Sequence, residues 1–215
     1  MGSHYHVTNK HKYNLKFGRE ANRDILANSP EELENIDVLN SIVSEHKNNQ
    51  VPRLQVLEDY FLSQNTGILE GQRRKDAEKA DHRAVHNFAK YISQFIVGYL
   101  TGNPITFTHE DEETQQTIYD LNDQNDGDAV NSDVALDLSI YGRAYEIVFR
   151  DEYGLDRFMT LDPKSTFVVY NHDIDKKVIA GVRYYDTVDK DSIKTNHIDV
   201  YTCLLYTSPS PRDRG

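Results

Sequence analysis

The chain has 215 residues, of which 38% are hydrophobic and 27% are charged, and its formal net charge is −11. This composition is typical of a folded protein, and the acidic balance argues against tight non-specific binding of nucleic acid, which depends on Lys and Arg contacts to phosphates. The most apolar run, Phe95–Leu100, is far shorter than the ~20 residues that cross a bilayer, and the polar stretch Met1–Lys16 lacks the apolar centre of a secretory signal. We therefore expect no membrane partner.

Residues 1–28 are polar and are predicted to form a flexible arm. The arm contains His4, His6 and His11, so a metal site is the alternative interpretation, because histidine is a common ligand. No defined helical context places two of them on one face, and the arm is favoured. No metal-ligating residue is assigned.

A first helix is predicted to begin at Ser29-Pro30-Glu31-Glu32, because Ser is a common N-cap, Pro suits the first turn and acids favour the positive helix end. The apolar residues that follow at helical spacing predict an inward stripe: Leu33, Ile36, Leu39, Ile42 and Val43. Pro52 is predicted to open a second helix, which faces inward through Leu54, Leu57 and Phe61 and exits at Gly67 and Gly71.

Gly71–Asp81 is a charged connector. Its Arg73-Arg74-Lys75 run is interpreted either as a contact to DNA phosphates or a neighbouring subunit, or as part of a solvated loop. The loop is favoured because acids follow at once.

The strongest helix prediction covers Asp81–Thr101, and we expect this helix to be a buried organiser. Its apolar face consists of Val85, Phe88, Ala89, Ile92, Phe95, Ile96 and Tyr99. Gly102 is expected to be a left-handed cap, and Pro104 prevents further helix. Gly98 inside the helix predicts a close backbone approach.

Ile105–Thr108 is predicted to be a strand, and Glu110–Asn125 an acidic helix with Ile118 and Leu121 inward. Asn122–Asp133 has the glycine of a calcium loop but lacks the first Asp and the last Glu. A helix–turn–helix at Asn125, Asp126 and Gly127 is favoured. The next helix is expected over Asp128–Tyr141, with Gly142 after it, burying Val130, Val134, Leu138 and Tyr141.

From Arg143 the apolar period changes from helix to strand. Ala144–Arg150 and Leu155–Thr160 flank Glu152-Tyr153-Gly154 and predict a hairpin. Further strands are expected at Thr166–Tyr170, Val178–Tyr185 and His197–Tyr201. His172, Asp173 and Asp175 form a turn cluster, for which a metal site is a minor alternative.

The chain contains no Gly-rich phosphate loop, Gly-x-Ser-x-Gly elbow or His-Glu-x-x-His motif. No catalytic or cofactor-binding residue and no cofactor is assigned, and no enzyme activity is expected. Six tyrosines on apolar stripes or strand ends are predicted to pack in the core or at subunit interfaces: Tyr91, Tyr99, Tyr141, Tyr145, Tyr184 and Tyr185.

Two segments resemble the portal proteins of tailed bacteriophages, in particular the SPP1-type portals of Gram-positive siphophages. They are Asn87–Phe107 (NFAKYISQFIVGYLTGNPITF) and Asp137–Phe149 (DLSIYGRAYEIVF). Leu161-Asp162-Pro163 followed by Phe167–Tyr170 supports the resemblance. We take it to cover Val51 to Thr202.

The resemblance implies an α+β fold, with N-terminal helices followed by a strand-rich antiparallel layer, from the wing of a portal subunit. It divides the chain into an arm (1–28), a mainly helical wing portion (29–142) and a strand-rich wing portion (143–202). The stem, clip and crown of the family are expected to lie outside the chain.

The resemblance also implies a structural function. Portals of this family form rings of twelve subunits at one capsid vertex, and double-stranded DNA passes through their channel without sequence-specific binding. The implied partners are further copies of the subunit, the terminase large subunit, scaffold and major capsid proteins, and head-completion adaptors. The implied location is the virion, with the host cytoplasm during assembly.

The Leu33–Val43 stripe and the N-terminal arm are our expected contacts with a neighbouring subunit, and Leu39→Asp with Ile42→Asp is expected to weaken the ring. Because the stem and crown are expected to lie outside the chain, we expect it to expose apolar surface that the rest of the subunit or the ring would cover. Two alternatives remain: a metal-dependent nuclease or hydrolase built on acidic clusters, and an acidic interaction module of a prophage.

The last segment, 203–215, is interpreted as a non-native tail. Cys203–Asp213 reads as the translation of a transposase-adapter sequence used in sequencing libraries. A natural Ser/Pro-rich terminus is the alternative. On the adapter interpretation, the natural segment has no cysteine and the gene is expected to continue past Thr202.

Overall fold

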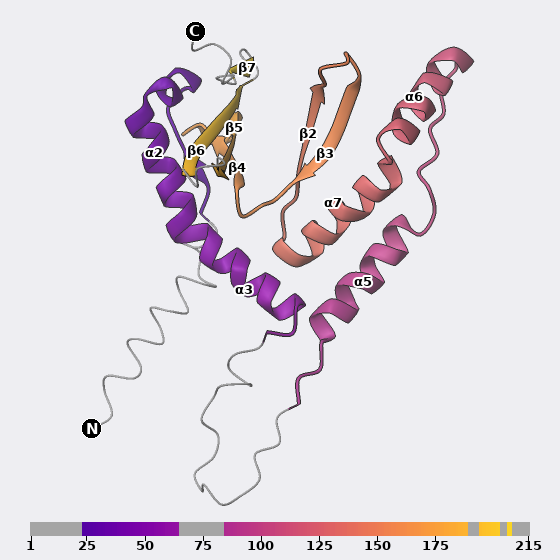
Figure 1. Ribbon diagram of the computed structural model, residues 1–215, viewed down its shortest axis with the longest axis horizontal. Helices are drawn as coiled ribbons and strands as arrows, with labels where there is room; N and C mark the ends of the chain where they lie inside the picture. The colour runs from indigo at the N-terminus through magenta and orange to yellow at the C-terminus, as the bar shows by residue number, and fades with distance from the viewer. Residues whose placement is uncertain (1–22, 65–83, 189–193, 203–205, 208–215) are drawn as a thin grey trace, which may run out of the picture. The chain divides into compact units, whose positions relative to one another are not determined.

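The computed structural model describes residues 23–64, 84–188, 194–202 and 206–207 (Figure 1). Helices and antiparallel-rich sheets make up the fold, which confirms the predicted α+β class. Packing divides the chain into two compact units. Unit 1 is Met1–Leu54 with Asp162–Gly215, and unit 2 is Gln55–Leu161. Unit 1 is therefore built from two stretches that are far apart in the sequence, unlike the sequential portions expected above.

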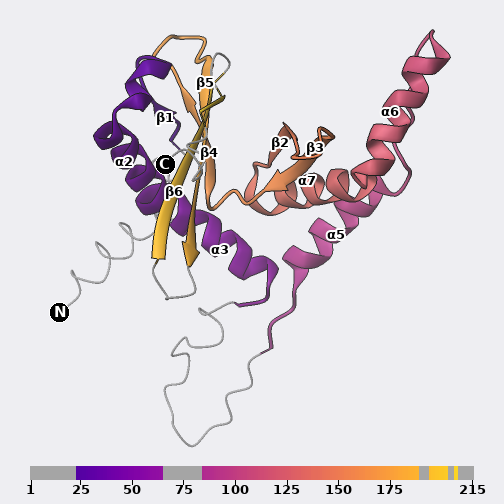
Figure 2. The ribbon, with the colours of Figure 1, turned by 45° about the horizontal axis from the view of Figure 1, so that its top comes forward.

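A five-stranded sheet forms the centre of unit 1 (Figures 1 and 2). Strands β4 (Thr166–Tyr170), β5 (Val178–Val188) and β6 (Lys194–Thr202) are antiparallel neighbours, and Val182 lies opposite Val200. Two short strands flank them: β1 (Ile25–Leu26) runs parallel to β4, and β7 (Tyr206–Thr207) runs antiparallel to β6. The three predicted strands are confirmed, and β5 and β6 are longer than predicted.

The predicted first and second helices are one continuous helical rod. A 3₁₀ turn (Pro30–Glu34) precedes α2 (Ile36–Glu45), a π-helical turn (His46–Gln50) and α3 (Val51–Phe61). The predicted second helix is therefore confirmed as α3, which begins one residue before Pro52, although it continues from α2 without a break in the helical backbone. The wide turn lies directly before this proline, where a regular helix would require an N–H that proline lacks.

The N-cap of α2 is Asn35 rather than Ser29. The Asn35 Oδ1 atom accepts a hydrogen bond from the Asp37 backbone N–H at 3.0 Å. Ser29 instead precedes the 3₁₀ turn, and its side chain makes no capping hydrogen bond. The chain thus enters α2 six residues later than the Ser-Pro-Glu-Glu pattern predicts, with Asn35 rather than Ser29 as the N-cap.

The apolar side of α2 covers one face of the unit 1 sheet. The core consists of Ile25, Ala27, Leu33, Leu39, Ile42, Val43, Phe167, Val169, Ala180 and Val182. Ile36, by contrast, is 60% exposed, so its predicted burial is wrong. Because Leu39 and Ile42 pack inside their own subunit, the expected role of this stripe as a contact with a neighbour is also wrong.

Unit 2 contains the helices α5 (Phe88–Thr101), α6 (Glu112–Gln124) and α7 (Gly127–Tyr141). Figure 2 shows α5 beside α7. The helix α5 begins later than predicted, because Asn87 Oδ1 accepts the Lys90 N–H at 2.9 Å and caps it. The turn predicted between α6 and α7 is confirmed, with Asp126 in the left-handed region.

The segment from Ile105 to Thr108 is not a strand, which corrects another prediction. A side chain satisfies its backbone in place of a neighbouring strand. The Tyr119 hydroxyl accepts a hydrogen bond from the Phe107 N–H at 3.1 Å and donates to the Phe107 carbonyl at 3.2 Å. The two rings also meet edge to face.

The predicted hairpin is confirmed as β2 (Tyr145–Arg150) and β3 (Asp156–Leu161), which pair as a separate two-stranded sheet. Gly154 has a φ of 77° in the connecting turn, and Gly142 ends α7 with a φ of 71°. Only glycine adopts such angles at no steric cost. The Gly142 helix end is therefore as predicted.

Gly98 and Gly102 of α5 differ from prediction. Gly102 has a right-handed φ of −67°, and a Cβ there would collide with the Gly98 carbonyl oxygen. Within the described part of the chain, nothing lies within 4 Å of a Cβ built on Gly98, so the expected close backbone approach is not found there.

Several predictions fall outside the described residues: His4, His6 and His11, Gly67, Gly71, Arg73-Arg74-Lys75, and the tail apart from β7. No helix among the residues that the structure describes is long and apolar enough to span a membrane.

Candidate functional site

The most prominent surface feature of unit 2 is an exposed apolar face on α5. Seven large side chains of this helix are 40–83% exposed, and Tyr99 is the most exposed of them. They are Phe88, Tyr91, Ile92, Phe95, Ile96, Tyr99 and Leu100. The expected exposed apolar surface is thus confirmed, whereas the prediction that α5 is a buried organiser is wrong.

The helix packs on α7 through small polar side chains instead. Ser93 is the buried residue of α5. The Ser139 hydroxyl of α7 donates to Ser93 Oγ at 3.0 Å, and the Ser132 hydroxyl donates to Thr101 Oγ1, also at 3.0 Å. Small side chains let the two backbones approach closely, and paired hydroxyls avoid unsatisfied buried groups. The apolar side of α5 therefore points away from α7.

The spacing of the exposed face is that of a helix-packing seam. Phe88, Ile92, Phe95 and Tyr99 follow one another at intervals of four, three and four residues, the pattern by which one helix packs against another. The face contains no acidic residue. The one charged side chain of the helix, Lys90, extends over the Phe61 ring at 5.8 Å. We call these seven residues the α5 apolar face.

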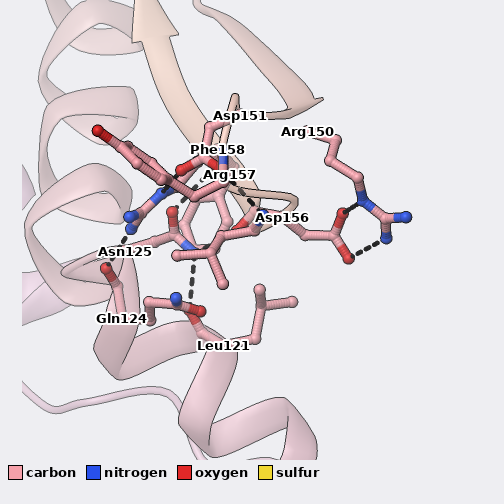
Figure 3. Close-up of polar contacts among 10 residues, drawn as sticks. Leu121, Gln124, Asn125, Arg150, Asp151, Asp156, Arg157 and Phe158 are labelled. Carbon is pink, nitrogen blue, oxygen red and sulfur yellow. Dashed lines mark hydrogen bonds and ion pairs between the residues drawn. The ribbon is translucent and has the colours of Figure 1, made fainter.

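A hydrogen-bond network fixes the β2–β3 hairpin to the α6–α7 turn (Figure 3). Asn125 is its centre. Its Nδ2 donates to the Leu121 carbonyl at 2.8 Å and to the Asp156 carbonyl at 3.1 Å, and its Oδ1 accepts the Phe158 N–H at 3.3 Å. One side chain thus joins three backbone groups from a helix and a strand.

Arg157 makes a second connection at the same place (Figure 3). Its guanidinium donates to the Gln124 carbonyl and to Asp151 Oδ2, both at 3.0 Å. The pKa of the Asp151 carboxyl is held below its usual value by the Leu155 backbone N–H first, and also by Arg157. The exposed Arg150–Asp156 pair beside it adds little, as surface ion pairs generally do.

A buried histidine makes a polar contact in the core of unit 1. The ring of His46, which is fully buried, stacks on Phe167 with centroids 4.6 Å apart. The Tyr184 hydroxyl donates to the Lys164 carbonyl at 2.7 Å, so its oxygen accepts from His46 Nδ1 at 3.0 Å. Burial, and then the charge of Asp162, raise the pKa of Tyr184 to about 12.

None of the described residues forms a group of three His, Cys, Asp or Glu side chains that would suit a metal ion. The acidic segment considered as a calcium loop instead forms the end of α6, a short turn and the start of α7. At the β4–β5 turn, Asp173 accepts from Asn171 and Asp175 pairs with Lys177.

Comparison with known proteins defines the class. The family model described as "Phage portal protein, SPP1 Gp6-like" matches residues 40–206. Because this match covers most of the chain, the chain belongs to this family of phage portal proteins.

One curated relative is the portal protein of Bacillus phage SPP1. It is 26% identical to this chain over 132 residues, which make up 61% of the chain and 26% of the relative. The chain therefore spans about a quarter of the length of the curated relative that it matches.

The predicted apolar stripe contains five of the seven residues of the α5 apolar face, without Tyr91 and Leu100, and their exposure was not predicted. Periodicity shows that a helix has an apolar side, but it does not show whether the same chain covers that side. The signal that was available is Ser93 together with Thr101, small polar residues on the opposite side of the helix from Phe95. The hairpin joint at Asn125 had no sequence signal beyond the predicted turn.

Proposed function

We propose that this chain forms part of the wing of a portal subunit. Twelve such subunits would form a closed ring at one capsid vertex, through which double-stranded DNA is packaged and ejected. The observation that carries the proposal is the family match across residues 40–206. The location that follows is the virion, with the host cytoplasm during assembly.

The proposed action requires no catalysis. The ring provides a channel, a docking site for the terminase large subunit, and attachment points for scaffold, major capsid and head-completion proteins. The acidic balance of the chain, −11 in total, suits a wall that DNA passes without being held, because tight non-specific binding needs cationic contacts to phosphates. We assign none of the described residues to terminase docking or to the channel wall.

Two features of the structure support a role in assembly. The α5 apolar face is large enough to require a cover, since monomeric proteins rarely expose extensive contiguous apolar surface. The Asn125 and Arg157 contacts hold the hairpin against the α6–α7 turn within unit 2. A hairpin that is fixed in this way keeps a defined position, as a subunit of an assembly requires.

Electron microscopy of the purified complete gene product tests the proposal. We expect closed rings of identical subunits, and nuclease-protected DNA when the rings are supplied to procapsids with terminase and ATP. A product that stays monomeric under all conditions would contradict it. Magnesium-dependent cleavage of DNA that is lost on removing one acidic cluster would favour the nuclease alternative.

A further inference from the structure

The α5 apolar face has the area of a specific protein interface. Its exposed fractions are 40–83%, and four of the seven side chains are aromatic. With ~150–250 Å² for each fully accessible aromatic side chain, the face offers roughly 800 Å², which is about what one partner contributes to a standard interface. A contact of this size is sufficient for a stable complex between two folded proteins.

The composition of the face matches the centre of an interface. Aromatic residues are enriched and acids depleted at such centres, and residues 88–101 contain four exposed aromatic residues, all Phe or Tyr, and no acid. Phe95 lies in the middle of the seam, with Ile92 and Tyr99 on either side. These three positions are the expected centre of binding energy.

Charge indicates which partner can approach. Two copies of a chain with a net charge of −11 repel one another over most of their surfaces, and like charges in contact destabilise a complex. Residues 88–101 contribute no acid to a contact between two copies. Among the described residues of α5 the one cation is Lys90, whose ammonium lies over the Phe61 ring, so this helix offers little to the phosphates of a nucleic acid.

We propose that the α5 apolar face packs against a second copy of this chain. This inference rests on the proposed function only for the expectation that the protein is oligomeric; the surface itself is assigned from its area, charge and spacing. In a closed ring the contact joins α5 to a different surface of the neighbour, because side-to-side ring interfaces are heterologous.

The test measures self-association of the 215-residue chain by sedimentation velocity over the micromolar range. We expect association that rises with concentration and strengthens when added salt screens the repulsion between acidic copies. Phe95→Asp is expected to weaken the association at least tenfold. Tyr99→Ser, which adds no charge, should weaken it in the same direction. Phe95 is 66% and Tyr99 83% exposed, so both variants should keep the wild-type circular dichroism spectrum.

Gln94→Asp is the matched control. Gln94 is an exposed polar residue of the same helix, and the substitution adds the same charge as Phe95→Asp without removing apolar area. It should leave association close to wild type. Equal loss in Gln94→Asp and Phe95→Asp would show that helix charge, not the apolar face, controls association, and would overturn the proposal.

Two further outcomes overturn the inference without touching the proposed function. One is a chain that stays monomeric throughout the concentration range. The other is a complete gene product whose rings form normally with Phe95→Asp. The same holds if its α5 amides are already protected from hydrogen exchange in the isolated subunit, because another part of the same subunit would then cover the face. Absence of rings from the wild-type gene product, by contrast, would count against the proposed function itself.

Discussion

Ser139 of α7 donates a hydrogen bond to Ser93 of α5, with 3.0 Å between the two hydroxyl oxygens. This contact orients α5, because it places the small polar side of the helix inward and Phe95 outward. A helix with an apolar face normally turns that face towards its own core. The opposite orientation in unit 2 is what makes an apolar surface available to a partner.

Enlarging the buried serine should therefore destabilise unit 2. Ser93→Leu is expected to lower the free energy of unfolding by ~1–3 kcal/mol, because overpacking forces helices apart, and it also leaves the Ser139 hydroxyl without its acceptor. Urea denaturation followed by circular dichroism measures the effect. Gln94→Leu, at the exposed neighbouring position, is the control; equal losses in the two variants would contradict the packing described here.

The two sides of α2 should differ sharply in their tolerance of truncation. Leu39→Ala is expected to cost ~2–5 kcal/mol of unfolding free energy, since Leu39 is only 7% exposed in the unit 1 core. Ile36→Ala, on the same helix but at an exposed position, should change stability by less than ~0.5 kcal/mol. Thermal and urea unfolding of the pair provide the measurement. Similar losses for both would mean that Ile36 is buried after all.

Asn125 should be a main determinant of the attachment of the hairpin. Asn125→Ala removes bonds to the Leu121 and Asp156 carbonyls and to the Phe158 N–H, and is expected to cost ~1–3 kcal/mol locally. Hydrogen exchange of the Phe158 amide should accelerate. Asp123→Ala, at an exposed residue near the end of α6, should leave that exchange rate unchanged. Continued protection of the Phe158 amide in Asn125→Ala would show that Asn125 does not hold the hairpin.

The unfolding free energy of unit 1 should decrease at alkaline pH because of Tyr184. Its folded pKa of about 12 exceeds the ordinary value near ~10, so the neutral phenol is favoured in the folded state. The stabilisation is complete below pH ~10 and is lost as pH rises through the folded pKa. Unfolding free energies on both sides of this window, with phenolate absorbance as the titration signal, measure the effect. Tyr184→Phe should show a weaker pH dependence, whereas Tyr153→Phe, at an exposed turn, should behave as wild type.

The sequence predicted local elements more reliably than their environments. Thr166–Tyr170, the hairpin around Gly154 and the end of α7 at Gly142 were all foreseen, because alternation and glycine turns are encoded within a few residues. Ile105–Thr108 was not, because the Tyr119 hydroxyl that satisfies Phe107 lies on the following helix. A tertiary contact of this kind leaves no trace in the local pattern.

The faces of the helices show the same limit. The stripes on α2 and α5 look alike in sequence, yet Leu39 is buried and Phe95 is exposed. The difference arises from what the chain supplies opposite each helix. The sheet strands β4 and β5, which begin more than a hundred residues later, cover α2. The side of α5 that carries small residues faces serines of α7 instead. No single-sequence period contains that information.

The division of unit 1 between two distant stretches has a consequence for synthesis on the ribosome. His46 and its partner Tyr184 are 138 residues apart in the chain. At ~5–20 residues per second, the interval between their emergence is on the order of ten seconds or more. During that time Leu39, Ile42 and Val43 of α2 have no sheet to cover them, while unit 2, residues 55–161, leaves the exit tunnel. Unit 2 can therefore fold first, and nascent α2 is the segment that most needs a chaperone.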